Sequence, residues 1–164
     1  MLKWTAIALT LAAAAPALAD ATADATAHSE AFAKACEAGD VQGVLALYAD
    51  NATVVWPGAG EEAKGKASIE KLATNFCNPK TKPKLVLKSI EGISLDSSHI
   101  ATVGHWEGTS IGPNGKPMTV QVRTTELLVK SGNAWRYLVD HASIGLPPPP
   151  KAAAKSESKA AKKK

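Results

Sequence analysis

The residues with the clearest potential for chemistry lie in the C-terminal half of the chain, in segments rich in β-branched residues. His105 and Glu107 are two positions apart, so on a strand their side chains share a face. A carboxylate beside an imidazole orients it and raises its pKa, which makes the two a candidate acid–base couple. The alternative is that both lie on an exposed strand face near a rim. Further polar candidates are Arg123, Thr125, Glu126, Asp140, His141 and Ser143.

Arg123 is the strongest candidate anchor for an anionic ligand. Its guanidinium can grip a carboxylate through two parallel hydrogen bonds, and Thr125 would lie on the same face of the strand. A cross-strand ion pair with Asp140 or Glu107 is the alternative for the same side chain.

Asp140 and His141 form a second candidate acid–base set, next to Ser143. A structural hydrogen bond is the preferred interpretation for His141 and Ser143, because a nucleophilic serine needs a sharp, exposed turn that an extended strand does not supply. The four histidines are scattered, and neither HxxxH nor CxxC occurs. We therefore predict no metal site and no cofactor; convergence of His105, Glu107 and His141 on a metal is the alternative.

The chain has two cysteines, Cys36 and Cys77. An even number of cysteines in an exported chain favours a disulfide, which would tie two different helices together. The alternative is two buried thiols that never meet.

The first half of the chain has the apolar spacing of helices. Residues 28–38 place Phe32, Ala35 and Cys36 on one face, and Asp40 is suited to cap a second helix that begins at Val41 and runs through Tyr48. Residues 52–56 form a short β-branched run that stops at Pro57. Helical spacing returns over residues 65–76.

The second half has the composition of four strands separated by turn residues, at 84–95, 99–109, 117–130 and 134–144. Consecutive strands joined by short turns form an antiparallel meander, and helices followed by strands are typical of an α+β fold. We expect N-terminal helices packed on one face of a strongly curved, mostly antiparallel sheet. This packing makes a cone with a cavity at its open end, and the sheet is also the surface through which we expect a homodimer.

Both ends of the chain differ in composition from this domain. Residues 1–19 combine Lys3, an apolar run and the small residues Ala17 and Ala19, which predicts a signal peptide cleaved before Asp20. We expect a disordered lead-in at 20–27, the domain at 28–146, and a Pro-rich then Lys/Ala-rich disordered tail at 147–164. The predicted location is outside the cytoplasm, in a bacterial periplasm.

The net charge of +4 comes from the ends of the chain. Six lysines and one glutamate in residues 151–164 contribute +5 and Lys3 contributes +1, so residues 20–150 carry −2. A function that needs positive charge, such as contact with an anionic envelope surface, would therefore depend on the tail.

Two segments resemble nuclear-transport-factor-2-like domains. The first is AGDVQGVLALYADNATVVWPGAGEEAKGKASI at 38–69, and the second is TELLVKSGNAWRYLVDHAS at 125–143. This superfamily includes ketosteroid isomerases, SnoaL-like polyketide cyclases, limonene epoxide hydrolases and the association domain of calmodulin-dependent kinases. The resemblance implies the cone-shaped α+β fold over residues 28–146, and implies little about activity because this fold hosts many chemistries.

The catalytic positions of these relatives are not kept. Trp56 stands where ketosteroid isomerases have their general-base aspartate, and Phe32 stands at their oxyanion-hole tyrosine; only the supporting tyrosine is matched, by Tyr48. Tryptophan cannot take a carbon-bound proton and phenylalanine cannot donate a hydrogen bond. Arg123 matches the epoxide-hydrolase arginine, but Thr125 replaces its neighbouring aspartate.

The sequence thus favours a binding module over a known enzyme. The expected ligand is a small, partly apolar and possibly acidic molecule, with Phe32, Tyr48 and Trp56 as walls and Arg123 and Thr125 as the polar contact. One alternative is an isomerase, cyclase or hydrolase that uses a non-standard set from His105, Glu107, Asp140 and His141. The other is an envelope-interaction protein that acts through its lysine-rich tail.

Overall fold

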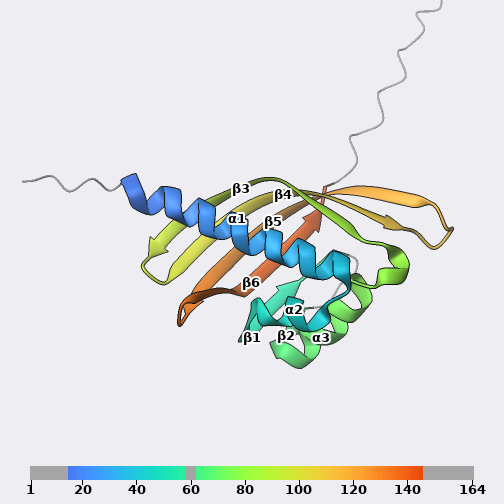
Figure 1. Ribbon diagram of the computed structural model, residues 1–164, viewed down its shortest axis with the longest axis horizontal. Coiled ribbons are helices and arrows are strands. Elements are labelled where there is room, and N and C mark those ends of the chain that lie inside the picture. Colours follow the sequence, from blue (N-terminus) through green and yellow to red (C-terminus); the bar gives the residue numbers. More distant parts are fainter. Residues whose placement is uncertain (1–14, 58–61, 146–164) are drawn as a thin grey trace, which may run out of the picture.

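The computed structural model describes residues 15–57 and 62–145 (Figure 1). Residues 1–14 of the predicted signal peptide and the predicted tail at 147–164 lie outside the described residues. Among the helices of the described part, none combines the length and the apolar character needed to cross a membrane.

The described residues of the N-terminal half form three α-helices and one short 3-10 helix. They are α1 (Ala15–Ala38), α2 (Val41–Ala46), α3 (Gly65–Phe76) and η1 (Pro79–Thr81). Asp40 caps α2 as predicted, because its Oδ1 accepts a hydrogen bond from the backbone N–H of Gly43 at 2.8 Å. The predicted bounds of α3 agree with the structure, whereas η1 was not predicted.

Helix α1 begins earlier than the sequence analysis expects. Residues 20–27 were predicted to be a disordered lead-in, but they are helical, and Ala21 and Ala25 are buried. Alanine has the highest helix propensity, and these small side chains let the helix lie close against the sheet. The sequence of this segment predicts disorder because its residues are small and polar. Alanines spaced along one face of a helix give only a weak hydrophobic periodicity.

The strands follow the predicted order, with two differences. They are β1 (Tyr48–Val55), β2 (Ala63–Lys64), β3 (Lys84–Asp96), β4 (His99–Ile111), β5 (Pro117–Ser131) and β6 (Ala134–Ile144). The two-residue strand β2 was not predicted, and Tyr48 begins β1 instead of lying in the second helix. The bounds of the other four strands differ from the prediction by at most two residues.

The six strands form one mixed, mostly antiparallel sheet in the order β2-β1-β6-β5-β4-β3. Neighbouring strands are antiparallel except for β1 and β6, which are parallel. This confirms the predicted α+β class. The β4–β5 pairing is continuous from His99 with Val129 to Ile111 with Pro117, which fixes the face on which each side chain of the two strands lies.

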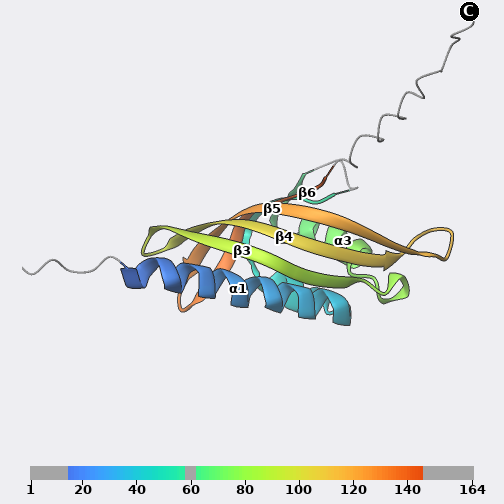
Figure 2. The same cartoon turned by 90° about the horizontal axis from the view of Figure 1, so that it is seen from above.

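All three α-helices lie toward the same face of the sheet, which we call the inner face (Figures 1 and 2). Helix α1 runs along β3, where a Cβ on Gly92 would lie 2.4 Å from the carbonyl oxygen of Ala21. Only glycine permits this approach of helix and strand. On β4 and β5 the inner face carries Ile100 and Leu128, which are buried, and the outer face carries Val103, which is 43% exposed.

The predicted disulfide is present. Cys36, near the end of α1, is bonded to Cys77, the residue after α3, and their Cα atoms are 4.7 Å apart. Both cysteines are buried. The bond holds the end of α3 against α1, beside the aromatic side chains described below.

Candidate functional site

A cavity of about 290 Å³ lies between the inner face of the sheet and the helices. Its sheet side is formed by β3, β4, β5 and β6, and its other side by α1, the residues that follow β1, α3 and the segment around η1. The lining residues are mainly apolar or aromatic: Phe32, Trp56, Pro57, Asn75, Phe76, Thr81, Pro83, Leu85, Trp106, Gly108, Thr109, Ser110, Val120, Val122, Thr124, Glu126, Tyr137, Asp140, Ala142 and Ile144.

Aromatic rings from different elements meet at one side of this cavity. The ring centroids of Trp56 and Phe76 are 5.0 Å apart, and those of Phe32 and Trp56 are 5.5 Å apart with an interplanar angle of 75°. These are the tilted and edge-to-face arrangements that aromatic pairs prefer. The cavity therefore has an apolar wall made of packed aromatic rings.

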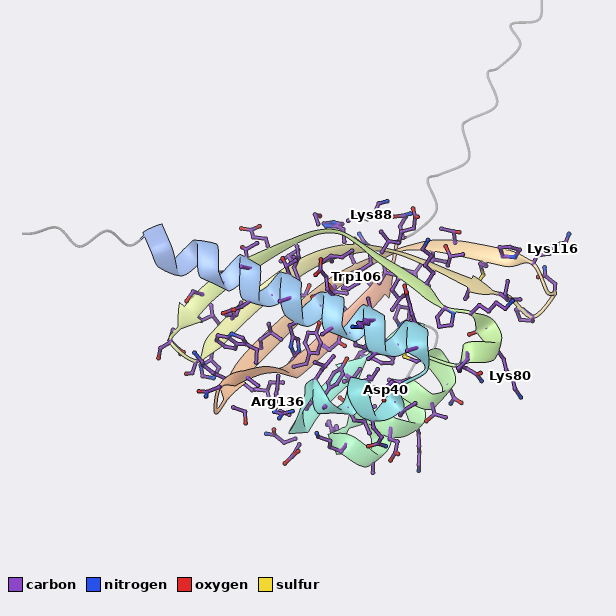
Figure 3. All side chains as sticks on the ribbon, viewed as in Figure 1. Asp40, Lys80, Lys88, Trp106, Lys116 and Arg136 are labelled. Atoms are coloured by element: carbon purple, nitrogen blue, oxygen red, sulfur yellow. A yellow bond between two sulfur atoms is a disulfide. The ribbon has the colours of Figure 1, made fainter. Side chains whose placement is uncertain are left out.

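The sheet side of the cavity is built from rows of residues that lie opposite each other across β4, β5 and β6. Thr102, Glu126 and Asp140 form one row. The next row is Gly104, Thr124 and Ala142, and the row after it is Trp106, Val122 and Ile144. The cavity wall therefore changes from polar to apolar along the strands. Figure 3 shows Trp106 in the middle of the molecule, whereas Lys116 and Arg136 lie at its periphery.

Asp140 is held by two hydrogen-bond donors. The Tyr48 hydroxyl donates to Asp140 Oδ2 at 2.6 Å, and Trp56 Nε1 donates to the same oxygen at 2.7 Å. Burial raises the pKa of Asp140, and these two hydrogen bonds oppose that effect by stabilising the carboxylate. Burial and the nearby charge of Asp140 also raise the pKa of Tyr48, so Tyr48 stays a donor.

Glu126 is the second carboxyl group in the cavity, and it is 5% exposed. The Thr102 hydroxyl donates to Glu126 Oε2 at 2.5 Å. Burial and the charge of Asp140 raise the pKa of Glu126 to about 7. Because two neighbouring buried carboxyls resist double ionisation, the pair holds a proton near neutral pH and can both donate and accept one.

Two polar atoms beside this pair make no hydrogen bond of ordinary length with another described residue, although the hydroxyl of one of them, Thr124, is close enough to Glu126 to oppose the rise in its pKa. They are Nε1 of Trp106 and Oγ1 of Thr124. Both residues line the cavity, and they are 6% and 7% exposed.

Of the residues named from sequence, Phe32, Trp56, Glu126 and Asp140 line the cavity. Tyr48 is fully buried behind them, where it positions Asp140 instead of forming a wall. Trp56 has a polar role as well as an apolar one, because its indole N–H donates to Asp140.

The remaining named residues lie on the outer face, away from the cavity. His105 and Glu107 alternate with the cavity residues Trp106 and Gly108, and Gln121 Nε2 donates to Glu107 Oε2 at 3.0 Å. Arg123, Thr125 and His141 are exposed, and alternate with cavity residues in the same way. The structure thus brings neither predicted pair, His105 with Glu107 or Arg123 with Thr125, into the cavity.

Sequence reasoning missed the inner partners of Asp140. Glu126 was a polar candidate without a role, and Thr102, Trp106 and Thr124 were not singled out. The available signal was alternation, since Val120, Val122, Thr124, Glu126 and Leu128 share one face of β5. This alternation did not show which face of β5 lines the cavity, because the opposite face also mixes polar and apolar residues. Among the described residues, no three potential ligands cluster as a metal site would require.

Comparison with known proteins gives one family and many similar folds. The model of the SnoaL-like domain matches residues 26–147. A solved structure from Xanthomonas campestris, named "Putative calcium/calmodulin dependent protein kinase II association domain", is 26% identical and has a TM-score of 0.70, covering 85% of this chain and 98% of its own. A comparison with curated protein sequences finds no match.

Two other solved structures share the fold at lower identity. A ketosteroid isomerase-like protein from Erwinia carotovora atroseptica is 21% identical, with a TM-score of 0.64 and coverage of 77% of this chain and 97% of its own. The hexachlorocyclohexane dehydrochlorinase LinA type 2 is 11% identical, with a TM-score of 0.68 and coverage of 76% and 84%.

Proposed function

Because the chain belongs to the SnoaL-like domain family, whose fold hosts many chemistries, we propose a function from the cavity itself: binding of a small, mainly apolar molecule. The observation that carries this proposal is the cavity of about 290 Å³ with aromatic walls and a few polar groups at one end. Ligand sites typically combine a concave apolar surface with few, well-placed polar groups.

The acidic ligand expected from the sequence is not part of this proposal. That expectation depended on Arg123, which is exposed on the outer face. Among the described residues, the charged groups inside the cavity are the carboxyls of Glu126 and Asp140, which would repel a buried anion. An uncharged ligand suits this site better.

The test is titration of the protein with tetralin, a bicyclic hydrocarbon, followed by ligand-observed NMR. Ala142→Leu places a larger side chain on the cavity wall, whereas His141→Leu makes a comparable change at the next residue on the outer face. We expect tetralin to bind the wild type and His141→Leu equally, and Ala142→Leu about tenfold more weakly or worse. Equal binding to all three proteins would contradict the proposal.

A second candidate function is proton transfer to or from the bound molecule. The observation that favours it is the pKa of Glu126, about 7, in a residue that lines the cavity beside Asp140. A general acid or base works best when its pKa lies near the working pH. In this function Glu126 exchanges the proton, Asp140 sets its charge environment, and Tyr48 and Trp56 position Asp140.

We further propose that the chain works outside the cytoplasm, in a bacterial periplasm. The Cys36–Cys77 disulfide supports this location, because such bonds persist in oxidising compartments. The signal-peptide pattern of residues 1–19 supports it as well. N-terminal sequencing of the protein recovered from the periplasm should begin at Asp20, and a retained Lys3 would contradict the proposal.

A further inference from the structure

Two hydrogen-bonding groups in the cavity wall are left without partners, and they come from neighbouring strands. Trp106 Nε1 belongs to β4 and Thr124 Oγ1 to β5, and neither makes a hydrogen bond of ordinary length with another described residue, although the Thr124 hydroxyl lies close enough to the Glu126 carboxyl to oppose the rise in its pKa. A buried donor without a partner costs free energy, so most such groups in folded proteins are paired with protein, water or ligand. Two in one cavity therefore need an explanation.

The two atoms converge on one glycine. A Cβ at Gly104 would lie 2.5 Å from Thr124 Oγ1 and 3.3 Å from Trp106 Nε1, so both atoms lie over the bare Cα of this residue. Any larger residue at this position would collide with the Thr124 hydroxyl. Gly104 thereby makes room for the Thr124 hydroxyl and the Trp106 indole to lie side by side, one row along the strands from Glu126.

The chemistry of the two groups defines what they can bind. An indole N–H only donates, and a threonine hydroxyl can donate as well. We propose that the cavity binds an uncharged ligand with a hydrogen-bond-accepting oxygen, of the ketone, ester or amide class, and that Trp106 Nε1 and Thr124 Oγ1 donate to this oxygen. This inference rests on the proposed binding function and specifies its ligand.

Other ligand chemistries fit these groups less well. An ammonium group has donors only, so it would leave the Trp106 N–H without a partner. A carboxylate or phosphate could accept from both groups, but it would place a negative charge one row from the buried carboxyls of Glu126 and Asp140. A neutral oxygen satisfies both donors and avoids this repulsion.

The experiment compares three molecules with the same carbon skeleton: α-tetralone, which has a carbonyl oxygen, tetralin, which has none, and aminotetralin, which is a cation. We expect wild-type protein to bind α-tetralone about tenfold more tightly than tetralin, the gain expected from a hydrogen bond to a buried, otherwise unpaired donor. Aminotetralin tests the alternative in which the Glu126–Asp140 pair attracts a cation, and tighter binding of aminotetralin than of α-tetralone would contradict the inference.

Two conservative variants remove the donors and keep the wall. Trp106→Phe removes the indole N–H, and Thr124→Val removes the hydroxyl with little change of shape. Each should reduce the preference for α-tetralone over tetralin to less than about threefold. Two variants serve as matched controls. Trp135→Phe removes an indole N–H that donates to Asp24, and Thr125→Val removes a hydroxyl on the outer face. Both should keep the wild-type preference for α-tetralone over tetralin.

A spectroscopic readout separates a direct contact from a structural effect. The infrared carbonyl band of bound α-tetralone should lie at lower frequency in wild type than in Trp106→Phe or Thr124→Val, because hydrogen bonds weaken the C=O bond. Equal affinity for tetralin and α-tetralone, or a carbonyl band unchanged in both variants, would overturn the inference and leave the proposed binding function intact. Binding of none of the three molecules would overturn both.

Discussion

Glu126 and Asp140 lie directly opposite each other on β5 and β6, and both side chains line the cavity. Burial raises the pKa of each carboxyl group, and the charge of Asp140 adds to the effect on Glu126. Hydrogen bonds from Tyr48 and Trp56 fix Asp140, and one from Thr102 fixes Glu126. In the described part of the chain, this pair supplies the ionisable groups of a mainly apolar cavity.

The first prediction concerns the pH dependence of stability. The pKa of Glu126 is raised from its ordinary value of 4.5 to about 7. Between these two values the unfolded chain has lost this proton and the folded protein still holds it, so the contribution of Glu126 to stability falls as pH rises and is fully lost above pH 7. A shift of this size corresponds to about 3 kcal/mol.

Glu126→Gln imitates the protonated carboxyl at every pH and should remove this dependence. Relative to wild type, its free energy of unfolding in denaturant should increase by about 3 kcal/mol between about pH 4 and pH 8. Because the difference between two proteins is measured, groups that do not interact with Glu126 cancel, including His28, whose pKa burial lowers to about 4; the neighbouring Asp140 does not cancel, and its response is part of the measured difference. Glu107→Gln on the outer face is the control. A pH-independent difference for Glu126→Gln would refute the prediction.

The second prediction compares two fully buried tyrosines, Tyr48 and Tyr137. The Tyr48 hydroxyl donates to Asp140 at 2.6 Å, whereas the nearest partner of the Tyr137 hydroxyl is Ser29 Oγ at 3.4 Å. Tyr48→Phe should therefore lower the free energy of unfolding by about 2 kcal/mol, since a buried carboxylate loses a donor. Tyr137→Phe should cost less than about 1 kcal/mol. If urea denaturation shows that both variants lose the same free energy of unfolding, the hydrogen bond from Tyr48 to Asp140 contributes no more to stability than the contact between Tyr137 and Ser29.

The third prediction concerns the disulfide. Cys36 and Cys77 are 41 residues apart, and closing a loop of that length stabilises the folded chain by about 4 kcal/mol in the chain-entropy model. The double variant Cys36→Ser/Cys77→Ser should lose about this amount in chemical denaturation. Alkylation of the purified protein without reductant should add no mass, and full labelling under that condition would contradict the bond.

The fourth prediction is the homodimer expected from the sequence. The described helices leave the outer face of the sheet uncovered, and Ile93, Val103 and Val139 are 41%, 43% and 41% exposed. We predict that two chains associate through this face. Val103→Asp should weaken dimerisation about a hundredfold in analytical ultracentrifugation, because it buries an unpaired charge. Met118→Asp, at an exposed position near the β4–β5 turn, should not; a monomeric wild type would refute the prediction.

The fold could be predicted from sequence because its signals are local. Turn residues mark the ends of β3, β4, β5 and β6. The helical spacing of apolar residues over 65–76 predicts the observed bounds of α3. The start of α1 could not be predicted in this way. Its buried side chains there, Ala21 and Ala25, have little apolar surface, so only the tertiary contact with Gly92 distinguishes that segment from a polar linker.

The site was only partly predictable, because it depends on which face of each strand turns inward. Val103 is exposed on the outer face of β4 and Val122 lines the cavity from β5, so hydrophobicity does not distinguish the faces. His105 and Glu107 attracted attention as a pair within one strand. The pair that meets in the cavity, Glu126 and Asp140, comes from two strands and requires their register. Asp140, Glu126, Tyr48 and Trp56 were each named from sequence, but their contacts with one another were not predicted.

The fifth prediction tests proton transfer without knowledge of the natural reaction. If Glu126 accepts a proton from a bound ketone, the protein should catalyse loss of deuterium from the carbon next to the carbonyl group of α-tetralone in water. In this step the C–D bond breaks, the deuteron passes to the Glu126 carboxylate, and the electron pair enters the enolate, which later takes a proton that originates from water. The rate should increase as pH rises through about 7, where Glu126 loses its proton, and reach a plateau above it.

Removal of the carboxylate should abolish this exchange. Glu126→Gln keeps an acceptor for the Thr102 hydroxyl but cannot take a deuteron, so the rate measured by NMR should fall about a hundredfold or more. Glu107→Gln changes a carboxylate on the outer face and should leave the rate and its pH profile unaltered. Binding of α-tetralone with no exchange above the buffer rate would leave the cavity as a binding site and rule out Glu126 as a base toward this ketone. Exchange that persists in Glu126→Gln with an unchanged pH profile would instead show that another group is the base. Asp140 would then be the candidate, because it is the only other carboxyl that lines the cavity in the described part of the chain.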